Sequence, residues 1–180
     1  MDKQTLRTLA KNKRKEIDMA GISAILAEKL VKTKEYKNSK NIMLFYPLKD
    51  EVNLLSLLSD STKSFFLPRI NGEELECCPY KAGDELCESC FHTKEPVCKA
   101  CNKTDIDLVI VPALACDKQK YRLGYGGGFY DRFLSDFKGT KIVCIPSDFI
   151  VENVYPEKYD VKMDLIITEL FNTQFFRQSS

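Results

Sequence analysis

Four glycines, two arginines and an aspartate lie within one short segment, residues 122–132, which reads RLGYGGGFYDR. Glycine accepts positive φ and lets a ligand approach the backbone closely. The segment follows an apolar stretch and precedes one with helical periodicity, and a helix N-terminus offers unpaired N–H groups and the positive end of its dipole. This combination predicts a loop that binds phosphate. The alternative is a glycine-rich turn without a ligand.

The segment matches neither of the two common nucleotide-binding motifs. A Walker A loop requires Gly-Lys followed by Ser or Thr, and the sequence contains no such tripeptide. The dinucleotide fingerprint requires a glycine at the position of Phe129. We therefore expect the segment to bind ATP phosphates and not NAD, with Arg122 and Arg132 supplying positive charge.

Carboxylates near this segment are candidates for metal or substrate contacts. Asp131 falls in the first turn of the expected helix, where it either binds Mg²⁺ or stabilises the helix dipole. Asp164 precedes an apolar run and offers either a second oxygen ligand or a charge at a strand edge. Glu51 follows an expected strand and turn, a position that suits a substrate contact and equally a helix N-cap.

Cysteines are the second chemical feature of the chain. Four of the eight form two Cys-x-x-Cys pairs: Cys87, Cys90, Cys98 and Cys101. This spacing is typical of a structural four-thiolate Zn²⁺ site, and the alternatives are reduced thiols without a metal or a redox pair. The other four are expected to pack as small apolar residues: Cys77, Cys78, Cys116 and Cys144. His92 is the only histidine, which excludes a catalytic triad based on histidine.

Helices and strands must alternate to position these residues. Apolar periodicity predicts helices over residues 2–18, 22–34 and 129–137, with a short helical patch at 54–58. Apolar runs predict strands over residues 41–47, 64–70, 74–81, 108–114, 142–145 and 165–168. Such alternation predicts a three-layer α/β fold, with a largely parallel sheet covered by helices on both faces. In these folds ligands bind at the carboxyl ends of the strands, where the glycine segment lies.

We expect a single domain spanning residues 1–180, interrupted by a cysteine-rich loop insertion at about residues 83–104. This cysteine segment is polar and lacks periodicity. In the first helix, basic residues recur at steps of three or four: Lys3, Arg7, Lys11 and Arg14. Such a run is usually a solvated helix face.

Bulk composition excludes several protein classes. The formal net charge is only +1, so no overall basic field favours nucleic acid. The longest apolar run, residues 108–116, is far shorter than the ~20 residues of a membrane helix. The N-terminal residues lack the apolar region of a secretory signal. We expect a cytoplasmic monomer without nucleic-acid or membrane partners.

The segment at residues 117–134 closely resembles the signature of the 5-formyltetrahydrofolate cyclo-ligases, or 5,10-methenyltetrahydrofolate synthetases. Further similar segments follow the same order along the chain, at residues 3–7, 45–52, 67–69, 107–112 and 160–169. The resemblance implies a three-layer α/β/α fold of NagB/RpiA-like topology. It also implies ATP- and Mg²⁺-dependent conversion of 5-formyltetrahydrofolate to 5,10-methenyltetrahydrofolate. In the family, ATP phosphorylates the formyl oxygen, N10 attacks the resulting N5-iminium phosphate, and ADP and phosphate are released.

The resemblance also implies roles for individual residues. Reduced folate would contact Arg7, Glu51 and Tyr125, and Mg²⁺ would bind Asp131 and Asp164. ATP would contact residues at the N-terminus and in the glycine segment: Lys3, Arg7, Arg122, Leu123, Gly124, Tyr125, Gly126, Gly127, Gly128, Phe129 and Tyr130.

Several positions depart from the family pattern. Phe149 stands where glutamine is usual, Tyr159 where histidine is common, and Lys120 where glycine is usual. We expect these departures to surround the folate pocket. The double Cys-x-x-Cys is also absent from the pattern, and a zinc-clamped loop is our hypothesis for it. The alternative function is a non-catalytic nucleotide- or zinc-binding regulator on the same scaffold.

Overall fold

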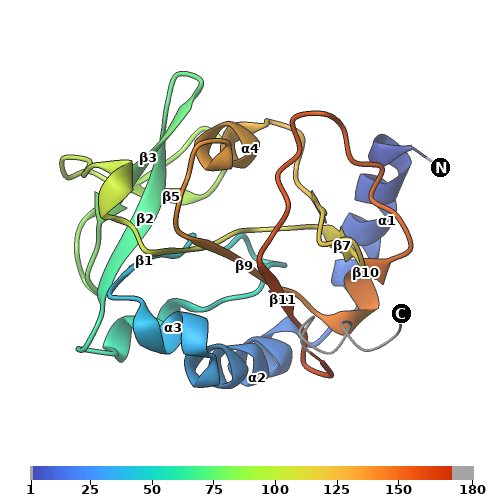
Figure 1. Ribbon diagram of the computed structural model, residues 1–180, viewed down its shortest axis with the longest axis horizontal. Helices are drawn as coiled ribbons and strands as arrows, with labels where there is room; N and C mark the ends of the chain where they lie inside the picture. The colour runs from blue at the N-terminus through green and yellow to red at the C-terminus, as the bar shows by residue number, and fades with distance from the viewer. Residues whose placement is uncertain (1, 172–180) are drawn as a thin grey trace.

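The computed structural model describes residues 2–171, which are built around a six-stranded sheet of order β11-β9-β6-β1-β2-β3 (Figure 1). Its strands are β1 (Asn41–Met43), β2 (Ser64–Asn71), β3 (Glu74–Pro79), β6 (Leu108–Ile110), β9 (Thr140–Cys144) and β11 (Leu165–Ile167). All neighbours pair in parallel except β2 and β3, which form an antiparallel hairpin. The predicted, largely parallel sheet is confirmed.

Helices cover both faces of this sheet because successive strand residues point to opposite sides. Ile42 and Leu108 belong to one apolar cluster with α2 and α3, and Met43 and Val109 belong to the other with α1 and α4. Figure 1 shows α2 and α3 on one side of the sheet and α4 on the other. The helices are α1 (Lys3–Arg14), α2 (Met19–Lys32), α3 (Lys34–Asn38) and α4 (Phe129–Leu134). The predicted three layers are confirmed.

Capping residues set the helix ends differently from the prediction. The Asp2 carboxylate accepts a hydrogen bond of 2.7 Å from the Thr5 N–H at the start of α1. Asp18 caps α2 in the same way through the Gly21 N–H, so α2 begins at Met19 and not at the predicted residue 22. The first helix ends at Arg14, before the predicted residue 18. Within residues 2–171, no helix is both long and apolar enough to span a bilayer.

The strand expected over residues 108–114 is shorter, because Pro112 lacks the N–H that a central strand needs. The chain continues into a small sheet of order β10-β7-β8, made of β7 (Ala115–Asp117), β8 (Arg122–Leu123) and β10 (Ile150–Val151). Short 3₁₀ turns are η1 (Leu55–Ser59), η2 (Lys103–Asp105) and η3 (Ser147–Phe149).

The cysteine segment, residues 83–104, contains an antiparallel hairpin and is therefore not only a loop. Its strands are β4 (Leu86–Glu88) and β5 (Lys94–Pro96). Arg69 on β2 anchors the end of this hairpin by donating hydrogen bonds to the carbonyl oxygens of Pro96, at 3.2 Å, and Cys98, at 2.5 Å. The hairpin therefore packs beside the edge of the main sheet.

Candidate active site

A cavity of about 1180 Å³ lies at the carboxyl ends of β1 and β2 and beside the glycine segment. Its walls come from α1, the segments that follow β1 and β8, the cysteine segment, and residues 155–160. All residues that the family resemblance implies for ATP or folate line this cavity, and so does Asp131. Arg132, which was expected to supply charge to the phosphates, does not line it and donates hydrogen bonds to the Glu73 carbonyl oxygen. Ligands of parallel α/β folds bind at the carboxyl ends of the strands, and the structure gathers the residues implied for ATP and folate at that place.

Two glycines in the segment adopt backbone conformations that disfavour other residues. Gly126 has φ 109° and Gly128 has φ 70°, both in the left-handed half of conformational space. Gly128 also ends the loop, since it is the N-cap of α4. These turns place the start of α4 in the cavity wall, with Phe129, Tyr130 and Asp131 lining it.

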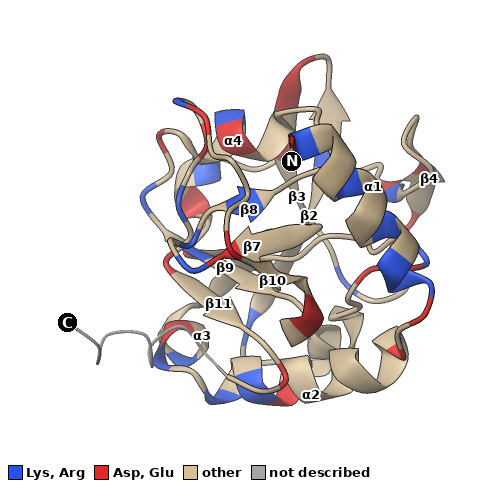
Figure 2. Ribbon diagram, turned by 90° about the vertical axis from the view of Figure 1, so that its right-hand side faces the viewer, with Lys and Arg blue, Asp and Glu red and all other residues tan. Residues whose placement is uncertain are grey.

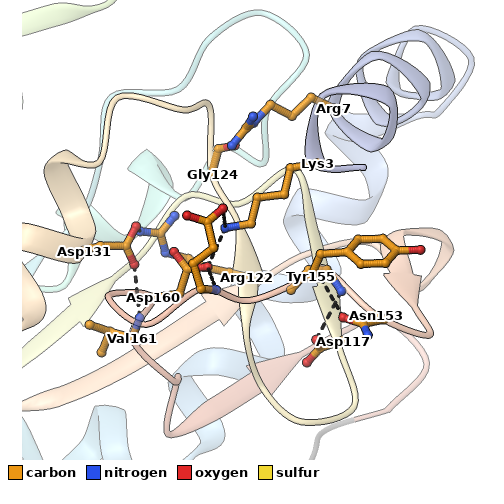
Figure 3. Close-up of polar contacts among 12 residues, drawn as sticks. Lys3, Arg7, Asp117, Arg122, Gly124, Asp131, Asn153, Tyr155, Asp160 and Val161 are labelled. Carbon is orange, nitrogen blue, oxygen red and sulfur yellow. Dashed lines mark hydrogen bonds and ion pairs between the residues drawn. The ribbon is translucent and has the colours of Figure 1, made fainter. Parts of the chain in front are cut away.

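Basic residues of α1 line the same cavity, namely Lys3, Arg7 and Lys11, and Figure 2 marks the basic positions along this helix. The Arg7 Nε donates a hydrogen bond of 2.9 Å to the Gly124 carbonyl oxygen. The Lys3 Nζ lies 2.6 Å from Asp160 and 3.0 Å from Glu157 (Figure 3). Burial lowers the pKa of Lys3, but hydrogen bonds to Asp160 and Glu157 outweigh it, so the pKa lies above its ordinary value. Lys3 is therefore a fixed positive charge at the cavity.

Asp131 links the glycine segment to its neighbours. Its carboxylate accepts hydrogen bonds from Arg122, at 3.0 Å, and from the Val161 N–H, at 3.2 Å (Figure 3). Arg122 is buried, and its Nε has no hydrogen-bond partner among the described residues. The buried Tyr130 hydroxyl also has none within residues 2–171. Because buried polar groups are normally paired, these two groups fit a site that receives polar ligand atoms.

Glu51 and Tyr125 meet at another part of the cavity. The Tyr125 hydroxyl donates a hydrogen bond of 2.6 Å to one Glu51 oxygen, and the Leu48 N–H donates to the other at 2.8 Å. Burial, followed by the negative charge of Glu51, raises the pKa of Tyr125. The phenol therefore remains protonated and holds the carboxylate in place.

Arg14 supports this pair and was not among the predicted site residues. Its Nη1 donates a hydrogen bond of 3.1 Å to the Tyr125 hydroxyl oxygen, and its Nη2 donates to the Ala113 carbonyl oxygen. The sequence interpretation placed Arg14 on a solvated basic face, whereas the residue is buried. The spacing of the sequence could have revealed this burial, because Arg14 follows Leu6 and Ala10 at steps of four residues and so lies on the same buried face of α1.

Residues 155–160 form the wall next to Lys3. Asp117, fully buried behind them, accepts hydrogen bonds from the N–H groups of Val154, at 3.2 Å, and Tyr121, at 3.0 Å (Figure 3). This anchor holds the segment so that Asp160 lines the cavity. Asp160 lies in one of the segments that are similar to the family, but the sequence predicted no role for it.

Asp164 is not among the residues that line the cavity. It precedes β11, and its carboxylate accepts a hydrogen bond of 2.7 Å from the Lys141 N–H and lies 3.0 Å from the Lys141 Nζ. The amino ends of parallel strands lie at the edge opposite the ligand site. Of the two carboxylates predicted to bind Mg²⁺, only Asp131 lines the cavity.

The cysteines predicted to bind zinc have separate neighbours. Cys87 donates a hydrogen bond to the Glu95 carbonyl oxygen at 3.5 Å, and Cys98 donates to that of Pro79 at 3.2 Å. Cys101 faces Cys77 instead, and Cys90 is an exposed free thiol. No group of three or more His, Cys, Asp or Glu side chains suited to a metal occurs in residues 2–171. Within the described residues these four thiols are not gathered into a metal-binding group, and the zinc-clamped loop stays a hypothesis.

The cysteine segment contributes to the cavity through other residues. The Phe91 ring packs edge-on against Phe129, with 5.7 Å between the ring centroids. The Thr93 hydroxyl donates a hydrogen bond of 2.9 Å to the Tyr46 carbonyl oxygen. Glu95 is buried and accepts a hydrogen bond of 3.1 Å from the Ile70 N–H. The insertion expected from the sequence is thus one wall of the site.

The three departures from the family pattern do not line the cavity. Phe149 is buried, with the Arg14 guanidinium 5.3 Å from its ring centroid. Tyr159 is 78% exposed. Lys120 has φ 72°, a conformation that favours the glycine usual at this position. None of the three residues therefore contributes to the cavity wall, and Phe149 lies behind it, against Arg14.

Comparisons with known proteins agree with the resemblance. The model of the 5-formyltetrahydrofolate cyclo-ligase family matches residues 1–169. The 5-formyltetrahydrofolate cyclo-ligase of Mus musculus is 25% identical over 93% of this chain and 89% of its own length. That of Mycoplasma genitalium is 28% identical over 93% of this chain and 98% of its own length.

A solved structure extends this similarity to the fold. The 5,10-methenyltetrahydrofolate synthetase of Aquifex aeolicus superposes with a TM-score of 0.83 and 30% sequence identity. The match covers 96% of this chain and 92% of that structure.

Proposed function

The chain belongs to the 5-formyltetrahydrofolate cyclo-ligase family, and we propose that it converts 5-formyltetrahydrofolate to 5,10-methenyltetrahydrofolate at the expense of ATP. The observation that carries this proposal is the shared cavity. It brings together the residues that the family resemblance implies for ATP and folate, although they come from α1, the segment after β1 and the glycine segment. Its volume of about 1180 Å³ exceeds the upper end of ordinary single-ligand pockets, roughly 1000 Å³, and so suits two substrates.

ATP phosphates bind at the glycine segment in this proposal. Lys3, Arg7 and Arg122 supply positive charge from two sides, and the buried Arg122 Nε and Tyr130 hydroxyl supply unused hydrogen-bonding capacity. Phosphoryl transfer requires positioning and charge neutralisation and no covalent protein nucleophile. Because the reaction needs no histidine base, it is consistent with a chain whose one histidine, His92, is exposed.

Reduced folate binds beside the phosphates, near Glu51 and Tyr125. The hydrogen bond between these two residues fixes a carboxylate that accepts N–H groups of the substrate. Tyr46 and Phe91 also line the cavity and offer aromatic surface for a planar ring. With the formyl oxygen held next to the terminal phosphate, ATP phosphorylates that oxygen, N10 attacks the activated carbon, and phosphate leaves as the new ring closes.

The residues present also fit Mg²⁺. This ion is usually bound by one or two carboxylates together with substrate phosphates, and Asp131 and Asp160 both line the cavity. We propose that Asp131 holds the ion and that Asp160, and not Asp164, is the nearby second carboxylate. Magnesium, when bound, supplies charge neutralisation for the phosphates. Arg122 and Val161 orient the Asp131 carboxylate for this role.

One assay tests the proposal. Purified protein is mixed with 5-formyltetrahydrofolate, ATP and Mg²⁺, and the methenyl product is followed by its absorbance while ADP and phosphate are quantified. We expect one ADP and one phosphate for each product molecule, and no product without ATP. ATP binding without any product would contradict the proposed catalysis and support the non-catalytic regulator instead.

A further inference from the structure

Two cysteines outside the cavity face each other across an antiparallel contact. Cys77 on β3 and Cys101 at the end of the cysteine segment form an isolated β-bridge, in which the Cys101 N–H donates a hydrogen bond of 2.8 Å to the Cys77 carbonyl oxygen. Their sulfur atoms lie 3.4 Å apart. Directly opposed residues of antiparallel strands have Cα atoms about 4.5–5.5 Å apart, which lies within the range that a disulfide spans.

The other nearby thiols are placed differently. Cys78 follows Cys77 on the same strand, so its side chain points to the opposite face of the sheet. The Cys98 sulfur donates its hydrogen bond to the Pro79 carbonyl oxygen. Of the sulfurs of Cys77, Cys78 and Cys98, only that of Cys77 is hydrogen-bonded to the sulfur of Cys101.

The two facing thiols also differ in access. Cys77 is 1% exposed, whereas Cys101 is partly exposed at the surface. A reagent in solution therefore reaches Cys101 first, and Cys77 is already in place behind it. This order of access is that of an attacking thiol and a resolving thiol.

We propose that Cys77 and Cys101 are a reversible disulfide site that reacts with low-molecular-weight disulfides. The Cys101 thiolate attacks one sulfur of the small disulfide, forming a mixed disulfide and releasing one small thiol. The Cys77 thiolate then attacks the Cys101 sulfur, forming the Cys77–Cys101 bond and releasing the second small thiol. The protein loses two electrons, the small disulfide gains them, and the two protons of the protein thiols end on the two released thiols.

The bond fastens a segment that forms part of the cavity wall. It joins residues 24 positions apart, and the closed loop contains the β4–β5 hairpin with Phe91 and Thr93. A cross-link restricts the unfolded chain, so the oxidised protein should resist unfolding more than the reduced one. This inference does not depend on the proposed enzymatic reaction, because neither cysteine lines the cavity.

Peptide mapping tests the site. The full chain is incubated with excess glutathione disulfide, free thiols are blocked with N-ethylmaleimide, and the protein is digested with trypsin. Cleavage after Lys99 separates Cys98 from Cys101. We expect peptide 70–81 linked to peptide 100–103, identified by mass spectrometry and removed by dithiothreitol. Because Cys77 and Cys78 share peptide 70–81, fragmentation of the linked species assigns the sulfur.

Single variants serve as matched controls. Cys98→Ala and Cys78→Ala should retain the linked peptides, whereas Cys101→Ala should lose them. Oxidation should raise the thermal unfolding midpoint of the unsubstituted chain and leave that of Cys101→Ala unchanged. Absence of the 70–81 to 100–103 link in the unsubstituted protein, or a link through Cys78 or Cys98, would overturn the proposal.

Discussion

The Arg122 guanidinium donates a hydrogen bond of 3.0 Å to the Asp131 carboxylate, and these two residues enclose the glycine segment from either end. The arginine side chain is 4% exposed and the aspartate side chain 22%. The contact ties β8 to α4, so the loop between them is closed before any ligand arrives. A cationic group and an anionic group are thereby both fixed in the wall where phosphate and Mg²⁺ are proposed to bind.

Replacing Asp131 tests this arrangement. Asp131→Asn keeps the size and the acceptor for the Val161 N–H but removes the charge that orients Arg122 and binds Mg²⁺. We expect kcat/KM to fall by about 10²-fold or more, the scale of losing one preorganised electrostatic contact. The measurement is the ATP-dependent rate over a range of Mg²⁺ concentrations. Asp136→Asn, at an exposed ion pair with Lys103, is the control, and equal rates for both variants would refute the role of Asp131.

The effects of replacing Arg14 and Tyr125 on folate binding should depend on each other. Tyr125→Phe removes the hydroxyl that connects Arg14 to Glu51, and we expect a rise of about tenfold in the KM for the folate substrate, equivalent to one hydrogen bond. Arg14→Met should weaken folate binding less in the Tyr125→Phe background than alone, with a coupling energy of about 1 kcal/mol. A double-mutant cycle of kcat/KM measures the coupling. Strictly additive effects would show that Arg14 acts through its contacts with Ala113 and Phe149 and not through Tyr125.

Replacing Lys3 should weaken the binding of ATP much more than that of folate. It is a charged group at the phosphate side of the cavity, held by Asp160 and Glu157. Lys3→Met should raise the KM for ATP by about tenfold, since one charge-assisted contact is lost, and leave the KM for folate within about twofold. Steady-state kinetics with each substrate varied in turn give both values. The exposed Lys15→Met is the control, and a larger effect on folate than on ATP would contradict the assignment.

Buried thiols should make the protein sensitive to alkaline pH. Burial raises the pKa of Cys144 to about 12, from an ordinary value of 9.0. Between these two values the unfolded thiol loses its proton while the folded thiol keeps it, so stability present below pH 9 is lost as the pH rises toward 12. One such group contributes at most about 1.4 kcal/mol per pH unit.

Urea unfolding at a series of pH values checks this loss. Cys144→Ala should lower stability near pH 7 because a buried group is removed, and it should flatten the decline above pH 9. Cys87→Ala, at an exposed thiol, should leave the slope unchanged. A Cys144→Ala slope equal to that of the unsubstituted chain would show that other groups cause the decline.

Replacing Lys120 with glycine should raise the stability of the protein. Its φ of 72° costs about 1–2 kcal/mol for a residue with a Cβ, and glycine avoids this cost while losing about 0.5–1 kcal/mol of chain entropy. Lys120→Gly should therefore stabilise the protein by about 0.5–1 kcal/mol in urea unfolding. Lys120→Ala also removes the hydrogen bond from Lys120 Nζ to the Asp164 carbonyl oxygen but retains the unfavourable conformation. If both variants lost the same stability, backbone strain at this position would be excluded.

The fold class and the main ligand-binding segment were predictable from local patterns of residues. Continuous apolar runs that alternate with helical periodicity along the chain predicted the parallel sheet and its two helical layers. The glycine segment was predictable from its composition, since glycine accepts the positive φ found at Gly126 and Gly128.

Tertiary structure decided which distant residues share the site. Arg14, Asp160 and Phe91 line or support the cavity, yet their roles depend on how α1, residues 155–160 and the cysteine segment pack around the glycine segment. Residue types suited to metal binding can also fail to converge. Strand direction places Asp164 away from the cavity, and the pairing of the β4–β5 hairpin gives the paired cysteines separate neighbours. Residue type and spacing indicate which backbone conformations a segment can adopt and which ligands its side chains could bind. Convergence of side chains depends on packing between segments far apart in the chain, which no local pattern encodes.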